Sequence, residues 1–339
     1  MKYSLSSKTF FVKEIFNPHI KEKGNYYYYL LEKSNMSHKE AVARIGIKPI
    51  WFSGVKDKNA HTMQWFCALE RISDVHEENF KIKYKGQSDE RIFVGKHKSN
   101  EFSVNVELSD TEILAMRHFK PKKELVCNYF GEQRFSEQNI GIIEALENKD
   151  YENALKLLLT KKNKHDSEKS GKIKRMVEAK WGSWEEIKNS PEVLGTKKIE
   201  LFEFLEKNPK SFEDAFMLAE PKSVAMIIKA AQAKRFNEEL NKTAEKKKPN
   251  NLKAQIIGQF PEYSLCASKA FPRSITIKPT EFEKKFRKGV LERKTFFSAE
   301  KFRVKKLEGV KYELNFELVR GAYATILLIY LNKWLKNFA

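Results

Sequence analysis

The chain has 339 residues, and its 64 lysines and arginines outnumber 45 aspartates and glutamates, so its formal net charge is +19. Such a charge favours a polyanion as partner, above all a nucleic acid, although a generally basic composition would also account for it. Three widely separated cysteines give no basis for a disulfide framework or a zinc site, and an N-terminus without an apolar core argues against a signal peptide, so the expected compartment is the cytoplasm.

The first fifty residues predict two strands and a helix. Short runs rich in aromatic and β-branched residues at 9–14 and 26–33 are typical of strands. A helix is expected over residues 37–45, where Ser37 provides an N-cap and Glu40, three residues later, completes a capping box.

Residues 51–67 contain a charged loop between two apolar, aromatic segments. The two segments predict buried strands joined by a tight loop. Asp57 lies on this loop between Lys56 and Lys58, and nearby positive charge favours the ionised form of a carboxyl. An ionised carboxylate anchored between core strands is a candidate nucleophile or base, although glycine and aspartate are also common in ordinary surface turns.

Further β-structure is expected over residues 80–108, with strands at 91–94 and 102–106 and a turn at 95–100. The three basic residues at 96–98 would either contact phosphate or form a solvated turn. A helix is predicted from Thr111 towards Val126.

Residues 128–135, Asn-Tyr-Phe-Gly-Glu-Gln-Arg-Phe, are too polar for a core strand and too aromatic for a free loop. Rings beside an amide and a cation are the groups that a nucleobase pocket needs, because they supply a π-face, hydrogen bonds to the base edge and a contact to phosphate. An aromatic loop packed on the core would have the same composition.

Helical spacing dominates from about Ala154 to Phe297, with lysine-rich runs at 161–174 and 246–248 that we expect to be solvated loops, some of them touching RNA. Strands are expected again at 313–318 and 321–331. The longest apolar run, residues 324–331, is too short to cross a bilayer, so no association with a membrane is expected.

Three segments resemble signatures of the TruD family of tRNA pseudouridine synthases. Residues 54–64 are similar to G-x-K-D-[KR]-x-A-x-T-x-Q and residues 128–135 to N-Y-F-G-x-Q-R-F. Residues 318–325 are similar to L-P-x-G-S-[YF]-A-T, with Val319 in place of proline and Ala322 in place of serine. Residues 9–14 are similar to the opening D-F-x-V-x-E, with Thr9 in place of the acid; a lysine six positions before the phenylalanine is here Ser4, and either Lys2 or Lys8 could replace it.

The resemblance implies that Asp57 is the catalytic residue. It also implies four side chains that bind the substrate: Phe10, Asn128, Phe130 and Tyr323. Four others would support the pocket or contact RNA: Lys56, Lys58, Gln133 and Arg134. The implied fold is α+β, a pseudouridine-synthase fold with a mixed, largely antiparallel sheet formed by residues 1–153 and 298–339, plus an inserted, mainly α-helical TRUD domain at residues 154–297.

The implied reaction is the isomerisation of uridine to pseudouridine in tRNA, at position 13 in the D-arm, with no cofactor and no metal. Asp57 would either attack C1′ of the ribose or assist proton loss at C2′. The partner would be tRNA, no protein partner is implied, and a monomer is expected. A basic RNA-binding or tRNA-folding protein without chemistry is the alternative; it explains the charge and the aromatic residues but not the lysine-flanked aspartate.

Overall fold

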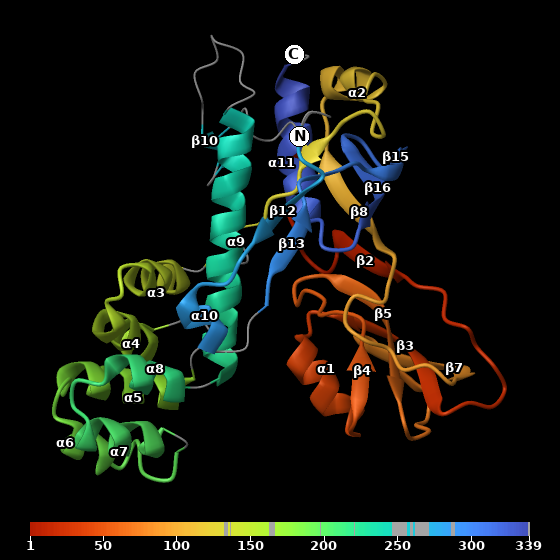
Figure 1. The fold of residues 1–339 in the computed structure, drawn as a ribbon. Coiled ribbons are helices and arrows are strands. Elements are labelled where there is room, and N and C mark those ends of the chain that lie inside the picture. Colours follow the sequence, from red (N-terminus) through yellow and green to blue (C-terminus); the bar gives the residue numbers. More distant parts are fainter. Residues whose placement is uncertain are drawn as a thin grey trace. The chain divides into compact units, whose positions relative to one another are not determined.

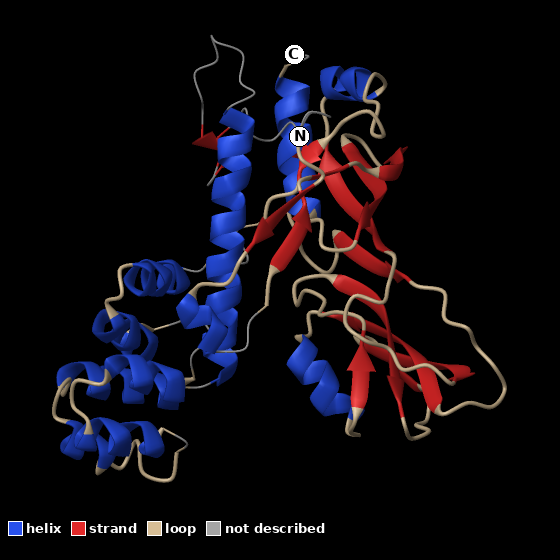
Figure 2. Cartoon of the chain, viewed as in Figure 1, coloured by secondary structure: helices blue, strands red, loops and turns tan. Residues whose placement is uncertain are grey.

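The computed structural model describes residues 1–131, 135, 137–162, 167–196, 198–219, 221–245, 256–257, 260–261, 271–285 and 289–337. The chain divides into two compact units, which are described separately. Unit 1 comprises Met1–Tyr129, Lys248–Arg273 and Lys294–Ala339, and unit 2 comprises Phe130–Lys247 and Ser274–Arg293. Strands dominate unit 1 and helices dominate unit 2 (Figure 1, Figure 2).

Unit 1 is built on a ten-stranded sheet with the order β15-β16-β8-β2-β5-β3-β7-β6, to which β1 is added beside β8 and β4 beside β5. Its strands are β1 Lys2–Tyr3, β2 Phe10–Ile15, β3 Tyr26–Ser34, β4 Ile50–Phe52, β5 His61–Ala68, β6 Val75–Glu77, β7 Phe80–Ser88, β8 Ser99–Glu107, β15 Glu300–Lys306 and β16 Lys311–Val319. Among the described pairs of this sheet, β2–β5 is parallel and the others are antiparallel. The predicted mixed, largely antiparallel sheet is therefore confirmed.

Strands from both ends of the chain meet in the centre of this sheet. β16 pairs with β8 over the register Lys311↔Glu107 to Val319↔Ser99, and the two strands lie side by side in Figure 1. β2 pairs with the other side of β8. The first and last segments of the chain thus share one sheet, as the distribution of the signatures predicted.

The two aromatic segments around Asp57 form β4 and β5, which pair with each other through Phe52↔Phe66. Phe66 is buried and stacks on Tyr29 of β3, with ring centroids 4.9 Å apart. The predicted helix is α1, His38–Ile45, and its capping box between Ser37 and Glu40 is present. It ends at Gly46, whose φ of 78° is readily adopted only by glycine.

The remaining elements of unit 1 are two helices and two short strand pairs. The helices are α2 Asp110–Met116 and α11 Ala324–Lys336; β9 Val126–Cys127 pairs with β14 Phe296–Phe297, and β10 Ile256–Ile257 with β11 Phe260–Pro261. Cys67 and Cys127 are buried and belong to no disulfide in the described part of the chain, whereas Cys266 lies outside it.

Three sequence predictions in unit 1 are wrong. The helix expected from Thr111 towards Val126 ends at Met116, where the backbone N–H groups of residues 117–119 bond three residues back instead of four; Pro121 then disfavours any continuation. Residues 91–94 form a loop rather than a strand. The strand expected at 321–331 is helix α11: the buried leucines of this segment, at 327, 331 and 335, have helical spacing that becomes visible only in a longer window.

Unit 2 is mainly α-helical. Its helices are α3 Glu137–Glu147, α4 Tyr151–Thr160, α5 Glu168–Ala179, α6 Trp184–Lys188, α7 Ile199–Lys207, α8 Phe212–Leu218, α9 Pro221–Glu245 and α10 Glu281–Lys285. β12 Ser274–Ile277 pairs with β13 Leu291–Lys294. The expected inserted domain, 154–297, overlaps this unit but begins inside α4, and its boundaries remain a prediction.

Of the two lysine-rich runs, the first is not a solvated loop over residues 168–174, and its residues 163–166 lie outside the described part of the chain. Residues 168–174 belong to α5, and Lys174 is buried with its Nζ donating to the carbonyl of Lys161 at 2.8 Å. The second run, 246–248, lies outside the described residues. Among the helices that the structure describes, none has the length and apolar character required to cross a bilayer.

Candidate active site

Asp57 lies on the loop that joins the adjacent strands β4 and β5. The residue is exposed as a whole, yet the surrounding protein desolvates its carboxyl and raises the pKa of this group above the ordinary 3.8. The positive charges of Lys33 and Lys56 act in the opposite direction and lower this pKa. A carboxyl on an exposed loop, whose charge is destabilised by surrounding protein, is characteristic of a reactive site.

The expectation that Lys56 and Lys58 together hold Asp57 ionised needs correction. Desolvation is the largest effect on the pKa of Asp57, and the second cation acting on it is Lys33 rather than Lys58. Lys58 is exposed and acts on Glu40 instead. The two lysines on either side of Asp57 do not act on it equally. Adjacency in the sequence therefore identified Lys56 but not Lys33.

Lys33 is entirely buried in β3, at 0% exposure. Its Nζ donates hydrogen bonds to the carbonyls of Met36 at 2.7 Å and Asp57 at 2.9 Å, and burial lowers its pKa to about 8. The sequence analysis did not identify this residue. Side chains alternate between the two faces of a strand, so Lys33 lies on the same face of β3 as the buried Leu31. This alternation could have predicted that Lys33 is buried.

Lys56 is buried as well, and a buried carboxylate pairs with it. Lys56 Nζ lies 2.7 Å from Glu14 Oε1, while Glu14 Oε2 accepts a hydrogen bond from the backbone N–H of Trp65 at 3.0 Å. Glu14 thereby joins β2, β5 and the loop of Asp57. Because its ammonium is engaged inside the protein, Lys56 fits the role of pocket support better than that of an RNA contact.

His97 extends this buried cluster. Its Nδ1 lies 3.6 Å from Glu14 Oε1 and also hydrogen-bonds to the hydroxyl of Ser53. Its Nε2 lies 3.4 Å from Asn100 Nδ2. Burial, and after it the charge of Lys56, lowers the pKa of His97, which favours the neutral imidazole. The expectation of a basic tip at 96–98 that contacts phosphate is therefore wrong for His97, whose side chain is buried.

Phe10 lies on the same face of β2 as Glu14, since residues four apart on a strand point the same way. It is buried and its ring stacks on Phe102 of β8, with centroids 6.0 Å apart; Phe102 in turn stacks on Phe316 of β16 at 5.4 Å. The phenylalanine thus borders the face that holds the Glu14–Lys56 pair. Its contact with a substrate remains a prediction.

Asn128 and Tyr323 come from two elements of unit 1 that lie against each other, because α11 contacts β9. Asn128 directly follows β9 and is buried, and its Nδ2 donates to the carbonyl of Lys294 at 3.0 Å. Tyr323 is half-buried at the N-cap of α11. Substrate roles for both residues remain predictions.

Phe130 belongs to unit 2. Its backbone N–H donates to Asn237 Oδ1 at 2.9 Å, and its carbonyl accepts from Asn237 Nδ2 at 3.0 Å. Its ring contacts the edge of Phe236 at a centroid distance of 5.5 Å, and the guanidinium carbon of Arg293 lies 4.1 Å from its centre. Gln133 and Arg134 lie outside the described residues.

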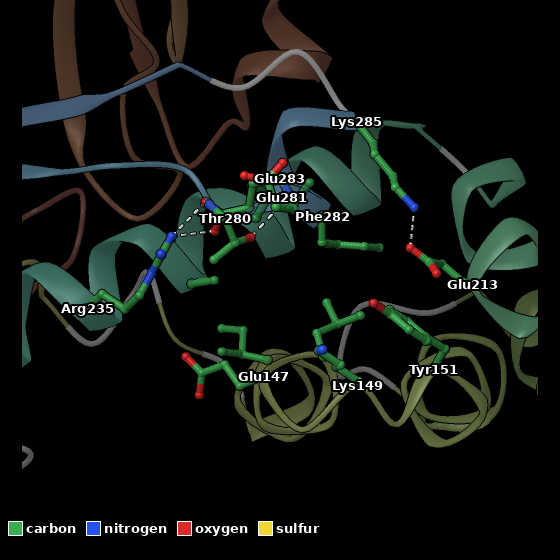
Figure 3. Close-up of a pocket in the computed structure, with 14 residues that line it drawn as sticks. Glu147, Lys149, Tyr151, Glu213, Arg235, Thr280, Glu281, Phe282, Glu283 and Lys285 are labelled. Carbon is green, nitrogen blue, oxygen red and sulfur yellow. Dashed lines mark hydrogen bonds and ion pairs between the residues drawn. The ribbon is translucent and has the colours of Figure 1, made fainter.

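Unit 2 also contains a cavity of about 610 Å³, lined by residues of α3, α4 and α8 to α10 (Figure 3). Charged side chains in its wall pair with each other. Arg235 Nη2 lies 2.6 Å from both carboxylate oxygens of Glu283, and Lys285 Nζ lies 2.5 Å from Glu213 Oε1. Of the predicted site residues that the structure describes, none lines this cavity.

An exposed carboxylate backed by buried cations, in a strongly basic protein, defines a candidate catalytic site of a nucleic-acid-acting enzyme. Comparison with known proteins identifies the family. The family model described as tRNA pseudouridine synthase D (TruD) matches residues 4–260. The chain therefore belongs to the TruD family of tRNA pseudouridine synthases.

Individual relatives agree with this assignment. The tRNA pseudouridine synthase D of Aquifex aeolicus is 29% identical, with 94% of each chain covered. The probable tRNA pseudouridine synthase D 1 of Methanococcus maripaludis is 23% identical over 97% of this chain and 98% of its own. The crystal structure of the putative TruD from Methanosarcina mazei matches with a TM-score of 0.61 and 20% identity, covering 98% of this chain and 92% of that one, and shows that the fold is shared.

Proposed function

We propose that this member of the TruD family isomerises uridine to pseudouridine in tRNA and that Asp57 is the catalytic carboxylate. One observation carries the assignment of the residue. Within the first family signature, Asp57 is exposed to solvent, and the lysines behind it, Lys33 and Lys56, are buried and held by other protein groups. A nucleophile or base must reach its substrate, while the groups that set its charge must stay in place.

In the proposed reaction the bond between N1 of the base and C1′ of the ribose breaks, and the base rotates in its pocket. A bond then forms between C5 and C1′, the proton on C5 is lost, and N1 gains one, so the product has the composition of the substrate. Asp57 either attacks C1′ or assists proton loss at C2′. Both routes require its ionised form, so activity should fall as pH drops through its raised pKa.

A uridine inside a folded tRNA must leave its stack to reach Asp57, at a cost of a few kcal/mol. Stacking of the flipped base on an aromatic ring returns about 1–3 kcal/mol. We assign this role to Phe130 or Tyr323, and we assign contacts near the base to Phe10 and Asn128. Phosphate contacts, including those proposed for Lys58, Gln133 and Arg134, would make the affinity fall steeply with salt.

The proposed target is the uridine at position 13, in the D-arm, and the proposed working form is a monomer in the cytoplasm. Release of tritium from tRNA transcripts labelled at C5 of uridine tests the reaction. We expect wild type to release tritium from a tRNA with uridine at position 13 and not from a matched transcript with cytidine there. Asp57→Asn should release none and still bind tRNA in a gel-shift assay; an Asp57→Asn variant that turns over would refute the catalytic assignment.

The net charge of +19 also fits a second function, the binding or folding of tRNA without chemistry. A strain that carries Asp57→Ala distinguishes the two. If it matches wild type both in pseudouridine content and in the growth of tRNA-limited cells, the non-catalytic function is favoured. Loss of pseudouridine with retained growth would mean that one protein performs both.

A further inference from the structure

A fully buried lysine lies directly beneath the loop of the candidate catalytic residue. Lys33 has 0% exposure, and its Nζ donates to the backbone carbonyls of Met36 at 2.7 Å and Asp57 at 2.9 Å. In the described part of the chain, no carboxylate oxygen lies within ion-pair distance of this nitrogen. The ammonium is thus held by two neutral oxygens, one of which belongs to Asp57 itself.

Burial of an ammonium without an ion-pair partner is costly, and an apolar side chain would avoid the cost. The lowering of the Lys33 pKa to about 8 by burial reflects this cost. The residues paired with Lys33 on the two adjacent strands, Thr62 of β5 and Phe80 of β7, are both buried, because β3 lies inside the sheet. A charge retained at such a position calls for a function other than packing.

The charged groups that act on this lysine come from two places in the chain, the loop between β4 and β5 and helix α1. Asp57 and Glu40 of α1 raise the pKa of Lys33, and Lys56 lowers it. Lys33 and Lys56 in turn lower the pKa of His38, whose burial already lowers it. Of the two cations that act on Asp57, Lys33 has the larger effect. Lys56 is already paired with Glu14 at 2.7 Å, whereas Asp57 is the first of the anions that act on Lys33.

We propose that Lys33 is a positioning residue for Asp57: its buried ammonium fixes the backbone of the loop and presents a stationary positive charge to the carboxylate. The inference rests on the proposed role of Asp57. It adds the source of the charge that keeps this carboxylate available for reaction, and it gives the loop its anchor in the sheet. Lys33 does not touch the substrate in this arrangement, since it is buried beneath the loop.

Lys33→Met, a substitution of similar volume without charge, tests the proposal in kcat/KM measured against pH by tritium release. Without the ammonium, the pKa of Asp57 rises, so the acid limb of the profile should move to higher pH. We expect a loss of about tenfold or more at pH about 6 and a smaller loss at pH about 8, with tRNA affinity within about twofold of wild type.

Lys81→Met is the matched control. Lys81 is a half-buried lysine of β7 whose Nζ lies 3.1 Å from Glu32 of β3, and its removal should leave the acid limb where it is. A purely structural role for Lys33 predicts a loss of activity that is uniform across pH. Either that result or an unchanged profile in Lys33→Met would overturn the proposal.

A second measurement needs neither turnover nor a folded Lys33→Met protein. The pKa of Lys33 can be followed by NMR of its side chain in wild type and in Asp57→Asn. Because the Asp57 charge raises the pKa of Lys33, this pKa should be lower in the variant. An identical pKa in both proteins would refute the coupling, whether or not the protein proves to be a pseudouridine synthase.

Discussion

Asn237 forms a pair of hydrogen bonds with the backbone of Phe130, accepting from its N–H at 2.9 Å and donating to its carbonyl at 3.0 Å. Both residues are buried, so these bonds are shielded from water. The amide side chain of one residue in α9 thereby holds the loop of the second family signature in the way that a neighbouring strand would.

Asn237→Leu should therefore damage both stability and activity. It removes both bonds and leaves an apolar side chain facing buried backbone groups, at a cost of about 1–3 kcal/mol. Displacement of Phe130 should also lower kcat/KM by about tenfold to a hundredfold, if this ring positions the base. Thermal unfolding and tritium release measure the two effects.

The control for this variant is Asn208→Leu in the same unit. Asn208 is exposed, and its side-chain amide donates to the carbonyl of Phe204 at 3.1 Å. A much smaller change is expected in both assays. Equal losses for the two variants would mean that the Asn237–Phe130 pair has no special part in activity.

Asp57→Asn should stabilise the protein while it abolishes turnover. The folded pKa of Asp57 is above its ordinary value, so the folded protein binds this proton more tightly than the unfolded chain. Stability is therefore lost as pH rises from the ordinary value through the folded pKa, and the ionised carboxylate is a net cost at neutral pH. Asparagine removes that cost.

The measurement is the unfolding temperature of wild type and Asp57→Asn at several pH values from about 4 to about 8. The variant should be the more stable at the upper end, and the difference should shrink towards the lower end. A variant that is less stable at neutral pH would show that the attraction to Lys33 and Lys56 outweighs desolvation.

Glu14→Gln should be strongly destabilising because it leaves the ammonium of Lys56 buried without its anionic partner. Breaking one side of a buried ion pair typically costs about 3–5 kcal/mol. The control, Glu101→Gln on the neighbouring strand β8, affects an exposed pair in which Lys13 Nζ and the carboxylate are 3.9 Å apart, and should change stability little. Urea unfolding compares them, and similar midpoints for the two variants would argue against a structural role of the Glu14–Lys56 pair.

In unit 2, Arg235→Met should destabilise the wall of the cavity. It removes the cation bound to both oxygens of Glu283, a carboxylate that is buried, and we expect a loss of about 3 kcal/mol. Lys284→Met, which affects the exposed partner of Glu281, serves as the control. Turnover at saturating tRNA should change less than stability does, because neither residue belongs to the proposed site.

Local and contiguous signals in the sequence predicted much of this protein. The capping box of Ser37, the paired strands around Asp57 and the mixed sheet follow from residues that are neighbours or form one recognisable string. The expectation that Asp57 lies on a loop between two paired strands is also confirmed.

The charged groups that surround Asp57 could not be predicted from a contiguous string of residues. Lys33 and Glu14 come from two other strands, and only the pairing of β2 and β3 with β5 brings them to the loop. Proximity along the chain therefore indicated Lys56 and Lys58, of which only Lys56 acts on Asp57, and it did not indicate Lys33. Strand and helix were confused at residues 321–331 for a related reason, since a short apolar run has no distinctive period.

The pairing of β16 with β8 has a consequence for how the protein is made. All of unit 2 lies between these two strands in the sequence, so a ribosome must synthesise almost the whole polypeptide before β8 gains its second neighbour. Contacts between such distant segments carry a large loop-closure entropy, which makes refolding slow. Until β16 has been synthesised, the backbone groups along one edge of β8 are unpaired and can pair with strands of other nascent chains. This topology therefore makes the protein prone to aggregation during synthesis.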